Sequence, residues 1–410
     1  MNNFNYLEEH GTVRVDGFDI SGGSNLEGVM IKEMTLSESL LTQSPHTSVK
    51  LHSTIYRPPG KNFDSWKNKD MTFNLIDGYG SSLNVNQKVY RLEERKFTPT
   101  NVGQTEEMTV RAVDKTLLKD AQCLVSKSWK CTKPSEIVSH VLSQCVEAQN
   151  KDVQSADPAR DYIAENLHPY QVIQQQANVA LDGDDPSFLH FMTYENNGKH
   201  YFKSLKKMAD EDSIMTYIQA DIDESVDGRT KPDTGYFKED YAINFSFPCD
   251  FDYLSDILNG LDENGKDQNS LGTVDQVFKI FSKMISGGGS QSCDCGIGQY
   301  NFKEGMSNKS TAEQRNSCNI DVEKHLLKRQ ARMGLLERDK IALRITVPCN
   351  LDLHAGKVIK LKWENKKEGG GEVYGSGDYL ISSMMHHIKL GGLSVTVMDC
   401  VSTTVGQGVV

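Results

Sequence analysis

The 410-residue chain lacks the motifs that usually reveal a catalytic or nucleotide-binding site. It contains no G-x-S-x-G, no G-x-x-x-x-G-K-[ST], no H-E-x-x-H and no G-x-G-x-x-G between a predicted strand and a predicted helix. Its 56 acidic residues are too many for spacing alone to single out a pair of catalytic carboxylates. We therefore predict that the protein is not an enzyme and has no catalytic, cofactor-binding or metal-binding residues.

Long apolar runs and excess positive charge are missing as well. No run approaches the ~20 residues that a membrane-spanning helix needs. The N-terminal stretch MNNFNYLEEHGTV has neither the basic start nor the apolar segment of a signal peptide. The formal net charge is −11, whereas a nucleic-acid-binding protein normally carries a basic surface. We expect neither a membrane partner nor sequence-specific binding to nucleic acid.

The nine cysteines are scattered and odd in number, which predicts reduced core thiols and not a disulfide framework. One group invites a zinc interpretation, because Cys293 and Cys295 are followed by Cys318 and His325. Their C-x-C spacing differs from the usual C-x₂₋₄-C, and no second close pair follows. Ordinary thiols in a loop are the favoured interpretation.

Two other candidate metal sites are weaker. His386 and His387 are neighbours on a predicted strand, so their side chains face opposite ways and do not chelate one ion together. The stretch DENGKD (262–267) resembles a calcium loop but lacks the acidic residue at position 5, the glycine at 6 and the glutamate at 12. We interpret it as a solvated loop.

The composition, with 37% apolar and 25% charged residues, fits a soluble globular protein of two to four domains. Apolar residues alternate with polar ones, a pattern typical of antiparallel strands with one buried face. The first ~118 residues contain such runs at 47–56, 71–76 and 106–113. Later runs lie at 215–222, 241–248, 340–348, 357–363, 377–390 and 393–401.

Helical periodicity appears between these β segments. Residues 131–150 carry apolar positions at 3–4 spacing, with Thr132 as the expected N-cap and Pro134 in the first turn. Residues 168–181 repeat the pattern. Further helices are predicted at 251–261, 273–286 and 322–340, and a loop at 287–318.

The stretch FLHFMTYENNGKHYFKSL (188–205) follows the second helix and is rich in aromatic residues. It predicts a hairpin that turns at Asn196-Asn197-Gly198, where asparagine and glycine tolerate positive φ. The rings favour packing by cross-strand pairs. A platform that stacks sugars or bases is the alternative, and it requires several rings on one exposed face.

Three stretches together resemble baseplate hub proteins of contractile-tailed bacteriophages. WKCTKPSEIVSHVLSQC (129–145), HPYQVIQQQANVAL (168–181) and PSFLHFMTYENNGKHYFKSL (186–205) are similar to the central module of those hubs. FDYLSDILNGL (251–261) is similar to a stretch that the hubs carry further on.

The closing β part also resembles the hubs. The matching stretches are ITVPCNLDLHAGKVIKL (345–361) and SGDYLISSMMHHI (376–388). They depart from the hub pattern at Cys349, where glycine is usual, and at Lys357, where an acidic residue is common. The resemblance covers about 129–261 and 340–400, and it reaches the first 118 residues only in style.

The resemblance implies an α+β, mainly β fold with two tail-tube-like antiparallel β domains and inserted α/β and mostly helical modules. Three chains then form a pseudo-sixfold ring, which is also the architecture of type VI secretion spike proteins. The expected domains are 1–118 (first β domain), 119–205 (α/β module), 206–237 with 339–402 (second β domain) and 238–338 (mostly helical insertion with a flexible loop).

The implied function is that of a structural hub, a homotrimer that joins a threefold central spike to a sixfold tail tube and lets DNA pass. Expected partners are the central spike, the tail tube or tube-initiator protein, and baseplate wedge and tape-measure proteins, in a virion assembled in the bacterial cytoplasm. The alternatives are the hub of a phage-derived bacterial injection apparatus and a tail-associated hydrolase or carbohydrate binder.

Overall fold

The structure is a computed structural model that describes most of the β and α/β segments predicted above. The described residues are 10–15, 18–20, 29–54, 66–100, 103–183, 185–219, 239–248, 342–363, 375–389 and 394–402, with 293–294, 299–300, 329, 333 and 336. The helices predicted at 251–261 and 273–286, the DENGKD loop, and Cys295, Cys318 and His325 lie outside these residues.

The first β unit is a curled antiparallel sheet. Its strands lie in the order β2-β1-β5-β6-β7-β4-β3. Alternate residues of β5 are buried, as the period-2 pattern predicts. The strands are β1 (His10–Val15), β2 (Phe18–Asp19), β3 (Val29–Ser39), β4 (His46–Thr54), β5 (Asp70–Ile76), β6 (Ser82–Thr100) and β7 (Gly103–Val113).

The second β unit closes on itself. From β13 the pairing runs through β19, β20, β21 and β18 to β15, and β14 returns to β13. Its core lies inside this ring of strands. The strands are β13 (Met215–Gln219), β14 (Glu239–Ala242), β15 (Asn244–Ser246), β18 (Leu343–Pro348), β19 (Val358–Lys362), β20 (Gly377–Ile388) and β21 (Val395–Ser402).

The sequence predicted one unbroken alternating strand at 241–248, and this prediction is wrong. Ile243 interrupts it and is 44% exposed, while Ala242 beside it is buried. The break lets β14 pair with β13 on one side and β15 pair with β18 on the other, which closes the unit. Both strands fall inside the expected insertion 238–338, although they pair within the second β unit.

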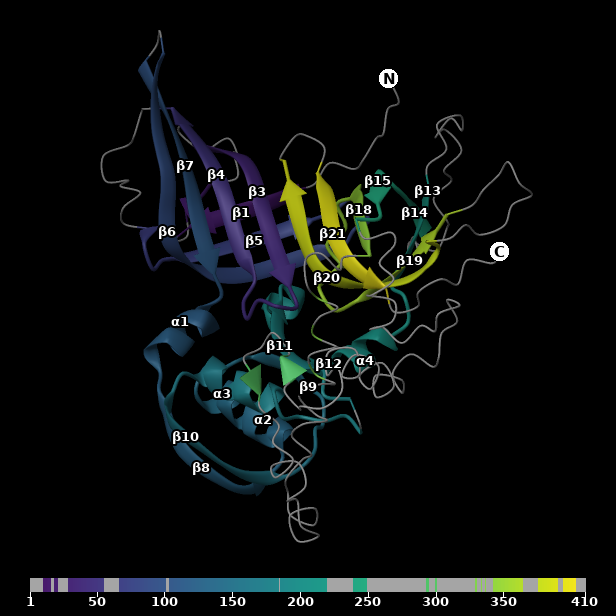
Figure 1. Cartoon of the computed structure of the whole chain (residues 1–410). Coiled ribbons are helices and arrows are strands. Elements are labelled where there is room, and N and C mark those ends of the chain that lie inside the picture. The colour runs from purple at the N-terminus through teal and green to yellow at the C-terminus, as the bar shows by residue number, and fades with distance from the viewer. Residues whose placement is uncertain are drawn as a thin grey trace, which may run out of the picture.

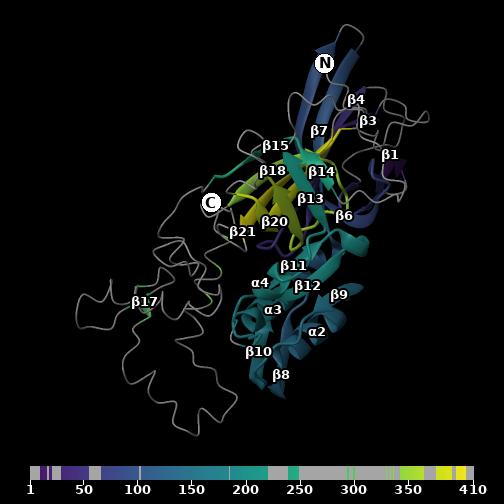
Figure 2. The same ribbon diagram turned by 90° about the vertical axis from the view of Figure 1, so that its right-hand side faces the viewer.

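The central module, residues 115–209, follows the first β unit along the chain and precedes the second. In Figures 1 and 2 it sits below both units. Its helices α2 and α3 pack on one face of a sheet ordered β11-β12-β9. Its elements are α1 (Lys115–Gln122), β8 (Val125–Thr132), α2 (Pro134–Gln144), β9 (Asn150–Val153), β10 (Arg160–Leu167), α3 (Pro169–Ala177), β11 (Phe188–Thr193), η2 (Glu195–Asn197), β12 (Lys199–Ser204) and α4 (Leu205–Ala209).

Both predicted helices of the module form, and both are shorter than their apolar pattern. The first begins at Pro134 with Lys133 as N-cap, because Thr132 is the last residue of β8. The expected N-cap at Thr132 is therefore wrong. The second starts with a capping box between His168 and Gln171.

The predicted hairpin is confirmed, with positive φ at Asn196, Asn197 and Gly198. All six residues of β11 are buried, so the hairpin is covered on both faces. Phe188 and Phe202 pack against the helices. Phe191 stacks on Tyr201 at 5.1 Å on the opposite face, where both meet the second β unit. The rings therefore pack the hairpin against the helices on one face and against the second β unit on the other, and they form no exposed platform.

The two β units share one strand topology. In chain order β1, β3, β4, β5, β6 and β7 correspond to β13, β14–β15, β18, β19, β20 and β21. Both sets lie side by side in the order first, fourth, fifth, sixth, third, second. They differ in their first strand, since β1 is antiparallel to β5 whereas β13 is parallel to β19.

A bulge in the fifth strand marks the same place in each unit. The pairing of β6 with β7 shifts between Val89 and Arg91, and that of β20 with β21 shifts between Ile381 and Ser383. A second shift in β6, between Glu93 and Lys96, has no counterpart in β20. A bulge inserts one extra residue into a strand, so it marks a defined point in the register from which residues can be counted. Counting from the two equivalent shifts aligns buried residues with buried residues: Val49, Met71, Phe73 and Val110 with Ile345, Ile359, Leu361 and Met398.

The approach to the fourth strand repeats as well. The amide of Asn68 donates to the Val89 carbonyl at 2.7 Å, and the amide of Gly356 donates to the Ile381 carbonyl at 2.9 Å. Asn68 has φ +63° and Gly356 has φ +84°, a left-handed conformation that asparagine and glycine tolerate best. The units are therefore a structural duplication that the sequence does not display as a repeat.

We expect Phe191→Ala and Phe202→Ala each to lower the free energy of unfolding by roughly 3–5 kcal/mol, because each ring leaves a cavity in a packed layer. Denaturant titration followed by fluorescence measures the loss. Ile163→Ala is the control, since Ile163 is 64% exposed and should change stability by less than ~0.5 kcal/mol. Equal effects at all three positions would contradict this packing.

Candidate functional site

The two β units join edge to edge, and we call this junction the seam. Residues Met34 to Ser39 of β3 pair antiparallel with Ile388 to Ser383 of β20. The amide of Leu40 extends the ladder by donating to the Ser382 carbonyl at 2.9 Å. The seam makes one sheet of 14 strands from the strands of both units, so neither β3 nor β20 presents an open edge there.

Glu38, on the buried face of β3, is the central side chain of the seam. Its side chain is 0% exposed. Oε1 accepts a hydrogen bond from the Tyr194 amide at 2.7 Å and lies 3.0 Å from Nδ1 of His354. Oε2 accepts from the Ala355 amide at 2.9 Å. One carboxylate therefore binds the first β unit, the central module and the second β unit together.

The charge of Glu38 controls its histidine partner. Burial disfavours the protonated ring, but the negative charge and hydrogen bond of Glu38 outweigh burial, so the pKa of His354 lies above its ordinary value. Nearby His386 is also buried but hydrogen-bonds Thr396 at 2.8 Å, and burial lowers its pKa to about 4. The ion pair sits beside a neutral imidazole.

Asp77 makes a second polar link, between the turn after β5 and the loop before β19. Its Oδ2 accepts from the Leu351 amide at 2.7 Å, and its Oδ1 accepts from the amides of Tyr79 and Ser81 at 2.9 and 2.8 Å. Burial raises the pKa of Asp77 despite these bonds. Leu351 then contributes to the core of the first unit, which makes the contact between the units apolar as well as polar.

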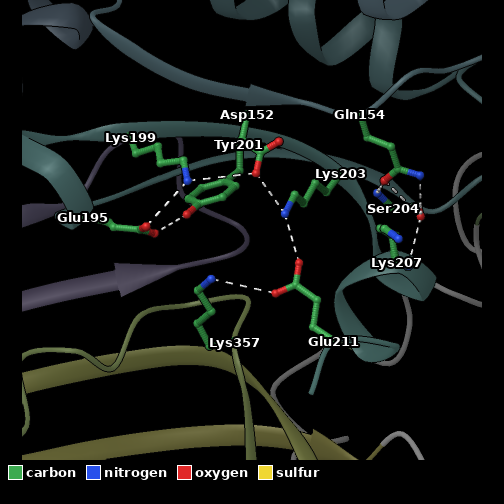
Figure 3. A network of polar contacts seen from close by, with 10 residues as sticks. All are labelled: Asp152, Gln154, Glu195, Lys199, Tyr201, Lys203, Ser204, Lys207, Glu211 and Lys357. Carbon is green, nitrogen blue, oxygen red and sulfur yellow. Dashed lines mark hydrogen bonds and ion pairs between the residues drawn. The ribbon is translucent and has the colours of Figure 1, made fainter. Parts of the chain in front are cut away.

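A network of charged residues fixes the module to the second β unit (Figure 3). Lys203 on β12 lies 3.0 Å from both Asp152 and Glu211, and Glu211 lies 3.8 Å from Lys357 of the second unit. Burial opposes the charge of Lys203, but the two carboxylates prevail, so its pKa is raised. Networked, part-buried charges of this kind hold elements in a fixed register.

Tyr201 lies in the middle of this network. Its hydroxyl donates to Glu195, and its ring lies beneath the ammonium groups of Lys199 and Lys203 at 4.7 and 5.2 Å. Burial and the adjacent carboxylate raise the pKa of Tyr201, so the hydroxyl keeps its proton. Each of these charged groups has a partner within the protein, so the network holds elements of the fold together.

The residues singled out by sequence play smaller parts. His386 and His387 lie on β20 as expected, and His386 is buried in the seam. Cys293 lies in the two-residue strand β16 (Cys293–Asp294), which pairs with β17 (Gln299–Tyr300). Within the described residues, no three His, Cys, Asp or Glu side chains are grouped to hold a metal ion.

Sequence reasoning missed Glu38, Asp77 and His354. A signal for Glu38 exists, because it shares a strand face with Met34 and Leu36 and is the only charged residue among the buried positions described in β3. A charge at an inward position of a strand predicts a buried partner. The identity of that partner, 316 residues away, is not encoded locally.

Comparisons with known proteins give a fold but no family. No family model matches the chain, and no curated protein matches it. A tail protein from Neisseria meningitidis MC58 shares 8% identity at TM-score 0.51, with 97% of each chain covered. The 43 kDa tail protein of prophage MuSo2 from Shewanella oneidensis shares 10% identity at TM-score 0.52, covering 97% of this chain and 98% of that one.

The chain therefore has the mainly β fold of phage tail proteins over nearly its whole length. This agrees with the resemblance to baseplate hub proteins that the sequence shows. Across the part of the chain that the structure describes, no helix is long and apolar enough to cross a membrane.

We expect Glu38→Gln to destabilise the protein by roughly 3–5 kcal/mol, because it removes one charge of a buried pair. Chemical denaturation measures the change. Glu33→Gln on the same strand is the matched control and should cost less than ~0.5 kcal/mol, since Glu33 is only half-buried. If the two variants unfold at the same midpoint, Glu38 does not have the role assigned to it.

The raised pKa of His354 predicts a pH dependence. Its pairing with Glu38 stabilises the fold fully below the unfolded histidine pKa of ~6.5 and is lost as pH rises through the higher folded pKa. The stability difference between wild type and His354→Gln should thus be larger at pH 6 than at pH 9. Glu195, Lys357 and His386 remain in both proteins, so their titration largely cancels. A difference that grows with pH would contradict the ion pair.

Proposed function

We propose that this protein is the structural hub of a phage tail baseplate, a homotrimer that joins a threefold central spike to a sixfold tail tube. The duplicated β unit carries the proposal. Three chains that each hold two units of one topology supply six similar units around a threefold axis. The fold shared with two phage tail proteins supports placing such a ring in a tail.

The domain plan belongs to the same proposal. The units at 1–118 and at 206–237 with 339–402 form the ring, while the modules at 119–205 and 238–338 lie outside it. The strands β14 and β15 favour moving the start of the second insertion beyond residue 248.

The proposed partners follow from this role. The spike binds on one side, the tail tube or its initiator on the other, and wedge and tape-measure proteins contact the hub in a virion assembled in the host cytoplasm. The net charge of −11 supports a passage through which DNA moves without being held, because acidic walls repel phosphates. The polar clusters around Glu38 and Tyr201 connect elements of the fold, which supports a role without catalysis.

Size-exclusion chromatography with light scattering tests the oligomeric state. We expect a mass of three times 45.8 kDa, about 137 kDa, that persists on dilution into the low micromolar range. A mass near 45.8 kDa at high protein concentration would contradict the proposal.

A further inference from the structure

The two strands of the seam, β3 and β20, each have an equivalent in the other β unit. On β20, residues 377–380 pair with β19, and after the bulge residues 383–388 pair with β3. The equivalent strand β6 uses residues 82–88 to pair with β5 and then passes its own bulge. Beyond it, within the described residues, β7 is the only strand that pairs with β6. Arg91, Leu92 and Glu93 pair with β7, and after a second shift the pairing resumes at Lys96. The outer half of β6, residues 91–100, therefore corresponds in position to the half of β20 that forms the seam, although β20 lacks the second shift.

The other side of the seam repeats in β15. Met34 of β3 pairs with Val49, and Phe245 of β15 pairs with Ile345. Val49 and Ile345 are equivalent, because they face Val110 and Met398 at the same distance from the bulges. Phe245 therefore stands at the position of Met34. Among described residues β15 pairs only with β18, so it lacks the neighbour that β20 gives to β3.

Burial differs between the equivalent positions in the direction that a missing neighbour predicts. Met34 and Leu36 are 1% and 0% exposed, and Ile388 and Leu351 of the second unit belong to the same core. The corresponding Phe245 and Phe247 are only half-buried.

These two rings and Trp363 form a half-buried aromatic cluster, with ring centroids 5.7–5.8 Å apart. Half-buried aromatic groups are typical of surfaces that another protein covers.

The two edges lie far apart within one chain. In the strand order, β6 and β15 are separated by β7, β4, β3, β20, β21 and β18. Figure 1 shows them on opposite sides of the molecule. Edges this far apart cannot meet within one chain. A head-to-tail contact between unlike edges closes into a ring when the rotation between copies allows it.

We infer that β15 of one copy pairs with residues 96–98 of β6 in a second copy, and so repeats between chains the seam of β3 with β20. The inference rests on the proposed trimeric hub and adds the surface that closes it. The register follows from the internal seam, where Thr35 lies opposite His387. Ser246 is equivalent to Thr35, and Lys96 is equivalent to His387 because Lys96 pairs with Glu107 and His387 with Val395. Ser246 thus lies opposite Lys96 of the neighbour.

The charge pattern of the outer half of β6 supports a specific partner. The stretch RLEERK (91–96), which leads into the paired segment, is charged, and Arg91 and Arg111 both bind Glu93, at 2.7 and 2.5 Å. Charged side chains on an open edge suppress indiscriminate strand pairing. β15, NFS, is uncharged, so it brings no like charge to Lys96, the charged residue that it faces.

Cysteine cross-linking tests the register. The double variant Ser246→Cys with Lys96→Cys is treated with a short bis-maleimide and run on a denaturing gel. Both side chains are exposed, so the substitutions leave the cores intact. We expect covalent dimers and trimers at ~10-fold above either single variant, because the seam holds the two thiols at high effective concentration. Asn244→Cys with Thr98→Cys, two residues along the same antiparallel register, should cross-link similarly.

The matched control is Ser246→Cys with Asn84→Cys. Asn84 is exposed on the same strand β6, but it lies in the half that pairs with β5. Both double variants carry the same nine native cysteines, so background reactions are equal. The control should cross-link no more than the single variants.

The outcomes separate this inference from the proposed function. A trimeric mass with cross-linking of both seam pairs only at the level of the control overturns the seam but leaves the hub. A monomeric mass without cross-linking overturns both. A trimeric mass with cross-linking restricted to the two seam pairs supports both.

Discussion

The pairing of β3 with β20 is the constraint on which the rest of the structure depends. It joins strands that lie more than 340 residues apart, and it is held by the buried carboxylate of Glu38, which takes one bond from the central module and two from the second β unit. A carboxylate buried without these donors is costly, so the three parts have one relative arrangement in which Glu38 is satisfied. The relative placement of the β units and the central module follows from this requirement.

The duplication explains why one seam carries information about another. The two units agree in strand order, in the site of the bulge, and in the left-handed residue that precedes the fourth strand, although their sequences show no repeat. The two units share the order of their inward-facing apolar positions and one local backbone conformation. The central module enters between the last strand of the first unit and the first strand of the second, so it interrupts neither ladder.

Much of the fold could be predicted from the sequence, and the parts that could not have physical reasons. The alternation at 71–76 and the turn at Asn196-Asn197-Gly198 are local signals, and both predictions are confirmed. The alternation at 241–248 misled, because a strand that switches partners at Ile243 keeps its pattern while its environment changes. The second covered face of the hairpin was missed because one sequence does not record which element covers a strand.

The polar connections were the least predictable part. Asp77 lies in a polar turn and looks like a solvated residue, yet it binds the amide of Leu351. Such partners are brought together only by the tertiary fold. Asp77 and Leu351 lie 274 residues apart, far beyond the range of a helical or strand periodicity. The resemblance to phage hub proteins supplied the trimer proposal, whereas the seam and its register come from the strand pairings.

Electron microscopy of the purified protein tests the central claim most directly, that two units of one topology are joined by one kind of seam throughout a closed ring. We expect particles with threefold symmetry in which six similar β units surround the axis and every neighbouring pair meets along paired strands. Particles of a single chain, or rings in which the units of neighbouring chains meet without strand pairing, would contradict it.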